Sequence, residues 1–165
     1  MSFLVPADVE GRRIIAFAWQ ATALFSVTAI VAAISQTLFL RVVAVAVALA
    51  LFAAGMVIFL LAYLRSIGRS RYEVISVAGV YLMTGGVAPT PVRRSFYGAL
   101  AVQIVVALAT ASARPYTSLA FGVLVPLLGL ALCGLWSAVW GTFPRRPEVG
   151  ATEAAVVESD DEEPG

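Results

Sequence analysis

Four long apolar runs dominate the pattern of hydrophobic and polar positions along the chain. None of them contains Asp, Glu, Lys or Arg, and each is about 19 to 26 residues long. At about 1.5 Å of rise per residue, a helix of that length crosses the roughly 30 Å of hydrocarbon in a bilayer. The runs cover residues 14–34, 42–64, 95–113 and 117–142. The pattern therefore predicts an all-α membrane protein with four transmembrane helices.

The basic residues divide unevenly between the two ends of these runs. All eleven are arginines. Only two lie in the first and third connections, Arg41 and Arg114. The other nine lie before the first run, between the second and third, or after the fourth, as Arg12, Arg13, Arg65, Arg69, Arg71, Arg93, Arg94, Arg145 and Arg146. Because short cytoplasmic loops carry the excess of basic residues, we expect both termini and a middle loop, 65–94, in the cytoplasm.

Two of the three connections between the runs are short. The first covers residues 35–41, and the other is the Arg114-Pro115-Tyr116 segment, whose proline favours the end of a helix. Short connections make consecutive helices antiparallel neighbours. We therefore expect two antiparallel hairpins, which together form a transmembrane domain over residues 14–143.

The two ends of the chain differ from the spans. We expect residues 1–13 to form a short cytoplasmic leader. We also expect the first run to be retained, because a signal-peptide core is only about 7–15 residues long. The C-terminal segment, 144–165, holds seven acidic residues and no basic residue after Arg146. Such a segment buries too little apolar surface to fold, so we expect a disordered acidic cytoplasmic tail.

Within the middle loop, residues 72–87 are almost wholly apolar but too few to cross a bilayer as a helix. Several of them are β-branched, which favours strands. Ala78-Gly79 could form the bend of a small β-hairpin, and Gly85-Gly86 could end it. We expect such a hairpin, with an interfacial helix or a re-entrant segment as the alternatives.

Three polar or helix-breaking residues stand out inside the spans. Gln20 and Gln103 lie at similar depth in two parallel spans, and a buried amide in hydrocarbon needs hydrogen-bonding partners. We expect both to face the bundle interior, either as contacts between helices or as part of a polar substrate or water site. Pro126 lies near the middle of the fourth run and predicts a kink, which is either structural or a hinge.

Small residues at helical spacing predict which faces of the spans pack together. In the second run they are Ala46, Ala50 and Ala54, and in the fourth run they are Cys133, Ser137 and Gly141, with Gly122 and Gly129 a heptad apart. Cys133 is the single cysteine, so a disulfide within one chain is excluded.

The residues that most catalysts and metal sites need are missing from this composition. The chain has no His, so imidazole cannot bind haem or zinc or act as an acid–base group. It has no Lys to serve a phosphate-binding loop, and one Cys cannot support a dithiol oxidoreductase. The spans contain no carboxylate, which argues against proton-coupled multidrug exporters of four-span size. We therefore expect neither catalysis nor a metal or cofactor.

Several short motifs in the C-terminal half are similar to one group of proteins. They are Gly85-Gly86-Val87-Ala88-Pro89 before Val92-Arg93-Arg94, Ala113-Arg114-Pro115, Ala120-Phe121-Gly122-Val123-Leu124-Val125-Pro126, Gly134-Leu135-Trp136 and Gly141-Thr142-Phe143-Pro144. Together they resemble small four-span integral membrane proteins of actinobacteria that carry no assigned activity. The resemblance implies a bacterial plasma-membrane protein and identifies no functional residue.

Two functions are compatible with these patterns. The first is a non-enzymatic accessory or scaffold subunit of a larger membrane assembly, with no nucleic-acid partner. The residues that would contact the partner or anionic lipid headgroups are Arg65, Arg69, Arg71, Arg93 and Arg94. The alternative is a small homodimeric transporter or lipid flippase, in which Gln20, Gln103 and the Pro126 kink would form the working site.

Overall fold

The computed structural model describes residues 11–35, 37–113 and 118–145. Most of the N-terminal leader, the Arg114-Pro115-Tyr116 connection and the acidic tail after Arg145 lie outside the described residues. What the sequence predicts for those segments stays a prediction.

The described residues form four spans close to the predicted runs. Three are continuous helices, α1 (Arg12–Ile34), α2 (Leu38–Arg69) and α4 (Thr90–Ala113). The fourth consists of a 3₁₀ helix, η1 (Ser118–Leu124), followed by α5 (Pro126–Trp140). All four are long and apolar enough to cross a membrane. By the length and composition of its helices, the chain is a multi-pass membrane protein.

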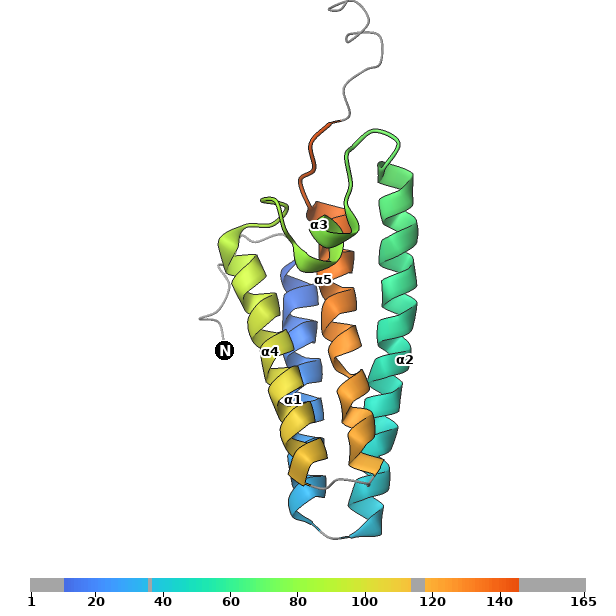
Figure 1. Ribbon diagram of the computed structural model, residues 1–165, viewed down its shortest axis with the longest axis vertical. Coiled ribbons are helices and arrows are strands. Elements are labelled where there is room, and N and C mark those ends of the chain that lie inside the picture. Colours follow the sequence, from blue (N-terminus) through green and yellow to red (C-terminus); the bar gives the residue numbers. More distant parts are fainter. Residues whose placement is uncertain (1–10, 36, 114–117, 146–165) are drawn as a thin grey trace, which may run out of the picture.

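The spans run up and down in one bundle (Figure 1). Helix α1 packs on α2, and α4 packs on both η1 and α5, as the short connections predict. The most extensive pairings, however, join helices from different hairpins, namely α2 with α5 and α1 with α4. The fourth span is the best covered: 56% of its most apolar window is buried, against 17% for α2. Helix α2 therefore leaves most of its surface outside the bundle.

The β-hairpin expected over residues 72–87 is wrong. A six-residue helix, α3 (Val77–Leu82), lies there, and the Oγ of Ser76 caps it by accepting a hydrogen bond from the Gly79 amide at 2.9 Å. The predicted bend at Ala78-Gly79 is thus inside a helix. Local β-propensity is overridden because one turn of helix buries Val80 and Tyr81 together.

Small residues do pack the bundle, but in α2 they are not the predicted ones. Ala46, Ala50 and Ala54 are all exposed. The buried small residues of α2 are Ala44, Ala48, Gly55 and Ala62. Both sets have the spacing of one helix face, and the pattern alone could not choose between them. In the fourth span the prediction is confirmed, because the five small residues that it named, Gly122, Gly129, Cys133, Ser137 and Gly141, are all buried.

The fourth span changes helix type at Pro126, where the sequence predicts an interruption. Proline has no N–H, so it cannot bond the carbonyl of Gly122 one turn earlier. The amide of Val125 donates to that carbonyl instead, at 3.1 Å, and the amide of Leu128 donates to the Val125 carbonyl at 2.9 Å. This exchange keeps the Gly122 carbonyl hydrogen-bonded in a layer that has no water to replace the lost bond.

Candidate functional site

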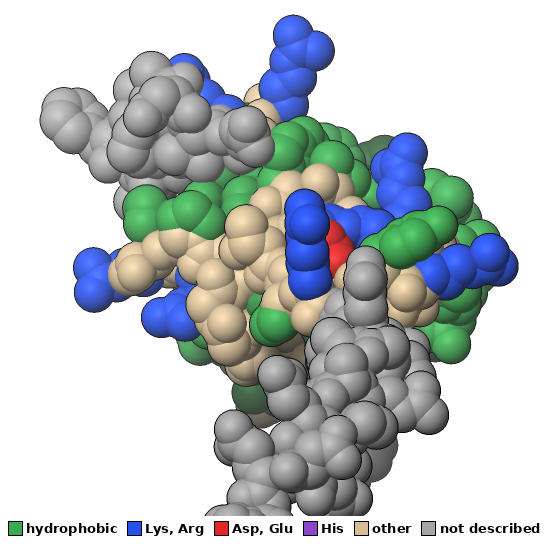
Figure 2. All heavy atoms as spheres, turned by 90° about the horizontal axis from the view of Figure 1, so that it is seen from above, with side chains coloured by type: hydrophobic (Ala, Val, Ile, Leu, Met, Phe, Trp, Pro, Cys, Tyr) green, Lys and Arg blue, Asp and Glu red, His purple; other side chains and the backbone are tan. Residues whose placement is uncertain are grey.

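One end of the bundle carries nearly all of its charged side chains. Helices α1 and α4 begin at this end, and α2 and α5 end there (Figure 1). Its arginines are Arg12, Arg13, Arg65, Arg69, Arg71, Arg93, Arg94 and Arg145, which we call the arginine face. Figure 2 looks onto this end, where acidic atoms (red) lie among the arginines (blue). They belong to Glu73, the sole Asp or Glu among the described residues.

Two segments far apart in the sequence meet on the arginine face, and together we call them the cap. They are residues 70–89, which include α3, and residues 141–145, which follow α5. The amide of Val74 donates to the Pro144 carbonyl at 2.8 Å, and the amide of Thr142 donates to the Val87 carbonyl at 3.2 Å. These backbone bonds tie the middle loop to the chain that leaves α5.

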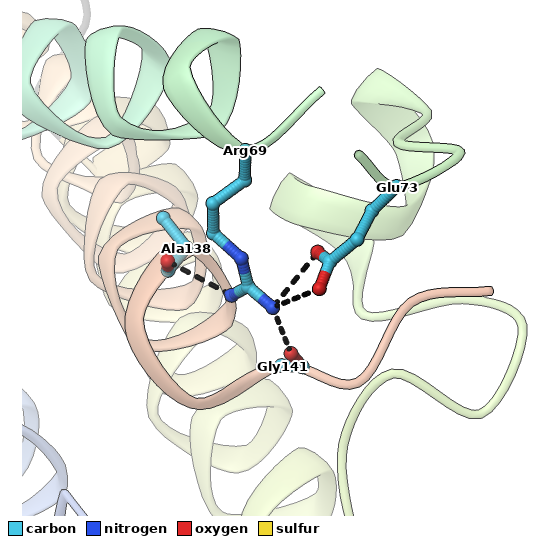
Figure 3. A network of polar contacts seen from close by, with 4 residues as sticks. All are labelled: Arg69, Glu73, Ala138 and Gly141. Carbon is cyan, nitrogen blue, oxygen red and sulfur yellow. Dashed lines mark hydrogen bonds and ion pairs between the residues drawn. The ribbon is translucent and has the colours of Figure 1, made fainter. Parts of the chain in front are cut away.

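Arg69, at the end of α2, joins the cap to α5 (Figure 3). Its guanidinium donates to the Ala138 carbonyl at 3.1 Å and the Gly141 carbonyl at 2.9 Å. The same group pairs with both carboxylate oxygens of Glu73, at 3.1 and 2.9 Å, and lies 5.4 Å from the centre of the Phe143 ring. The last carbonyls of a helix lack partners and carry partial negative charge, so Arg69 satisfies the end of α5.

This geometry changes the role expected for one of the five candidate arginines. Arg69 was predicted to contact a partner or lipid headgroups, but its guanidinium is used inside the chain. Arg65, Arg71 and Arg94 are exposed, and Arg93 is half-buried. The sequence contained one signal for the Arg69 pair, because Glu73 lies four residues further along.

Helix α3 is held on the bundle by Tyr81. The Tyr81 ring stacks on Phe59 of α2 with 4.2 Å between centroids, and its hydroxyl donates to the Phe59 carbonyl at 3.0 Å. The ring also lies directly over Gly134 of α5, where an added Cβ would clash with it. Burial raises the pKa of Tyr81 further above neutral pH, where the phenol is protonated in any case and donates this hydrogen bond. Sequence analysis missed this contact.

Inside the membrane-spanning region, Gln103 links three helices. Its Nε2 donates to the hydroxyl of Thr22 on α1 at 2.7 Å, and that hydroxyl donates to the Ala18 carbonyl at 2.7 Å. The Gln103 side chain is fully buried, and its Oε1 lies against Gly129 of α5, where an added Cβ would be 2.8 Å away. This buried amide oxygen has no hydrogen-bond partner among the described residues, so Gln103 uses only its N–H group in a hydrogen bond. The close approach to Gly129 is possible because position 129 has no side chain.

The other amide is not in the bundle interior, and the prediction for it is wrong. Gln20 is exposed on α1. Ala18 and Thr22 belong to the buried face of α1, and a residue two positions from each lies on the opposite side of the helix. Gln20 and Gln103 therefore share a depth but do not form a common site.

Among the described residues, no group of three or more His, Cys, Asp or Glu side chains could hold a metal ion. Cys133 is fully buried in α5. Comparisons with known proteins add no assignment, because no family model, curated protein or solved structure matches this chain.

Proposed function

We propose that the chain is a non-enzymatic accessory or scaffold subunit that assembles with another protein in a bacterial plasma membrane, with its arginine face in the cytoplasm. The observation that carries this proposal is the uncovered side of α2, the longest helix in the bundle. A side that the chain itself leaves open is available to a second transmembrane helix.

The residues on that side fit a helix better than they fit lipid alone. Ala46, Ala50 and Ala54 form an exposed row with four-residue spacing. Lipid tails gain little from such a row, whereas small residues let another backbone approach closely. The fold does not need this row for its own packing, since a separate set of small residues faces inward.

The cap adds exposed apolar side chains just after the end of α2. Tyr72 and Val74 follow the end of α2 and are 76% and 50% exposed, although backbone bonds and the Arg69 network hold their segment in place. Ordered apolar side chains outside the hydrocarbon layer are typical of protein contact surfaces. Exposed Arg65, near the end of α2, adds a charged group to this region.

The buried polar pair also supports a structural role. Gln103 donates a hydrogen bond to Thr22 of α1, and its side-chain oxygen lies close to Gly129 of α5. The amide therefore contacts two neighbouring helices.

The proposal is tested by purification from the native cells in lipid-preserving particles, followed by mass spectrometry. We expect a second membrane protein to co-purify in stoichiometric amount with the wild-type chain. It should no longer co-purify with Ala50→Phe, because that change places a large ring in the small-residue row. Ala101→Phe is the matched control, because Ala101 is an exposed alanine on α4. A partner that survives Ala50→Phe, or a homodimer carrying only lipid, would contradict the proposal, and the homodimer would favour transport.

A further inference from the structure

A groove of about 110 Å³ lies between the end of α2 and the first part of the cap. Most of the side chains that line it are aliphatic or aromatic. They are Tyr63, Ile67, Ile75, Val77, Val80 and Tyr81. None of the functions considered above uses this groove.

The cap side of the groove lies outside the hydrocarbon, so lipid tails do not cover it. Counted from Val42, about 20 helical residues cross the hydrocarbon, and they end near Leu61. Ile67 lies about 9 Å further along α2. Ile67 and Val77 are nevertheless 47% and 68% exposed. Apolar side chains that are held in place and face water are typical of a surface that binds a protein segment.

The C-terminal segment of the chain starts beside this groove. Glu73 and Arg145 form an antiparallel bridge, and the amide of Val74 donates to the Pro144 carbonyl at 2.8 Å. Because the bridge is antiparallel, the chain at Arg145 runs back toward the end of α2. Ser70, at that end, lines the groove. The residues after Arg145 therefore start next to the groove and in its direction.

The C-terminal segment, which lies outside the described residues, contains a short apolar stretch. It is Ala154-Ala155-Val156-Val157. Ala154 is nine positions after Arg145, which gives a reach of up to about 30 Å in extended chain. The groove is much closer, because Ile75, which lines it, is two residues from the bridge at Glu73. A short linker of this kind gives a segment a high effective concentration at a site nearby.

The charges at this end of the bundle also favour the C-terminal segment. Residues 158–163, which follow the apolar stretch, include five acids. The one acid among the described residues, Glu73, is paired with Arg69. The described residues therefore supply no acid to balance the other arginines of the arginine face, of which Arg71 and Arg145 are exposed beside the groove. Opposite charge draws the acidic residues toward this face.

We propose that residues 154–157 of the same chain bind in this groove. The sequence predicts disorder for the C-terminal segment because it buries too little apolar surface by itself, and the groove supplies the apolar surface that it lacks. The bound segment would cover the exposed apolar side chains of Ile67 and Val77. This site does not depend on the partner protein proposed above, because it is tested on the purified chain alone.

Disulfide trapping in the full chain tests this proposal. In a Cys133→Ala background, Val77→Cys places a thiol in the groove and Ala155→Cys places one in the apolar stretch, which keeps both of its valines. Leu82→Cys is the matched control, because Leu82 is exposed on the same short helix and does not line the groove. With a mild oxidant, we expect the disulfide within one chain to form about tenfold faster from Val77→Cys than from Leu82→Cys. Intact mass spectrometry after purification in lipid-preserving particles measures it.

A further variant tests the apolar part of the contact. Val156→Ser together with Val157→Ser keeps the length and charge of the segment, and it should lower the Val77→Cys rate to that of the Leu82→Cys control. Equal rates from Val77→Cys and Leu82→Cys, or no effect of the two serines, would overturn the proposal. Disulfides that join two chains in place of those within one chain would also overturn it, and they would make a second copy the occupant of the groove.

Discussion

At the scale of single residues, two polar side chains join parts of the molecule that the apolar pattern alone would not fix. Arg69 connects α2, the cap and the end of α5, and Gln103 connects α1, α4 and α5. The sequence predicted an inward Gln103 from the cost of an unpaired amide in hydrocarbon. The spacing of Arg69 to Glu73 was a signal for their ion pair, but only the fold shows that the Arg69 guanidinium meets the open carbonyls of α5.

Replacing Gln103 with leucine should lower the stability of the bundle without unfolding it. The change removes the 2.7 Å hydrogen bond to Thr22, and Thr22 keeps its own bond to the Ala18 carbonyl, so no donor is left unpaired. We expect a loss of about 0.6–2 kcal/mol in the free energy of unfolding. Titration with a denaturing detergent measures this free energy. The control is Gln20→Leu on the exposed side of α1, which should cause no loss of stability. Equal losses from the two variants would contradict the assignment.

Replacing Arg69 with glutamine should loosen the cap and leave the spans in place. Two carbonyls of the α5 end lose a charged donor, and Glu73 loses its partner. The Arg69 side chain is 30% exposed, so solvent weakens its interactions. We expect the free energy of opening the cap to fall by about 1–2 kcal/mol, which gives roughly 5- to 30-fold faster hydrogen exchange at the Val74 and Thr142 amides. Arg65→Gln removes the same charge from an exposed position, and matching exchange rates in the two variants would show that the network does not hold the cap.

At the scale of elements, the spans could be predicted far better than the segments between them. A long apolar run in hydrocarbon must hydrogen-bond its own backbone groups, and a helix does this. Pro126 predicted the place where the fourth span changes helix type. The 72–87 segment is too short to span the hydrocarbon, so this requirement does not apply to it. Its short helix depends instead on the contacts of Tyr81 with Phe59 and Gly134, which are distant in sequence. The inward side of α2 was missed for a similar reason, since it is set by the backbone of α5.

The contact between α2 and α5 gives a direct test at this scale. At Gly55 an added Cβ would lie 2.9 Å from backbone atoms of Leu128, so Gly55→Ala must push the two helices apart. We expect a loss of about 1–3 kcal/mol in the free energy of unfolding. Gly68→Ala in the same helix has nothing within 4 Å and should be neutral or stabilising, since alanine is the better helix former. A neutral Gly55→Ala would mean that α2 and α5 are less closely packed than described.

At the scale of the whole molecule, the bundle differs in exposure from side to side and in charge from end to end. Helix α5 is the most buried of the spans and packs on the other three helices. The outer side of α2 is exposed, and the arginines and the cap lie at one end of the bundle. The sequence predicted the charged end from the positions of the arginines. It could not predict the open side, which depends on how four helices of similar composition divide their faces.

We propose that the four helices cross the membrane with the arginine face in the cytoplasm, and cysteine labelling tests this orientation most directly. In a Cys133→Ala background, Thr84→Cys places a thiol in the cap and Thr37→Cys places one at the opposite end, both at exposed positions. An impermeant maleimide on intact spheroplasts should label Thr37→Cys, and Thr84→Cys should react only after lysis. Labelling of Thr84→Cys in intact spheroplasts would contradict the account.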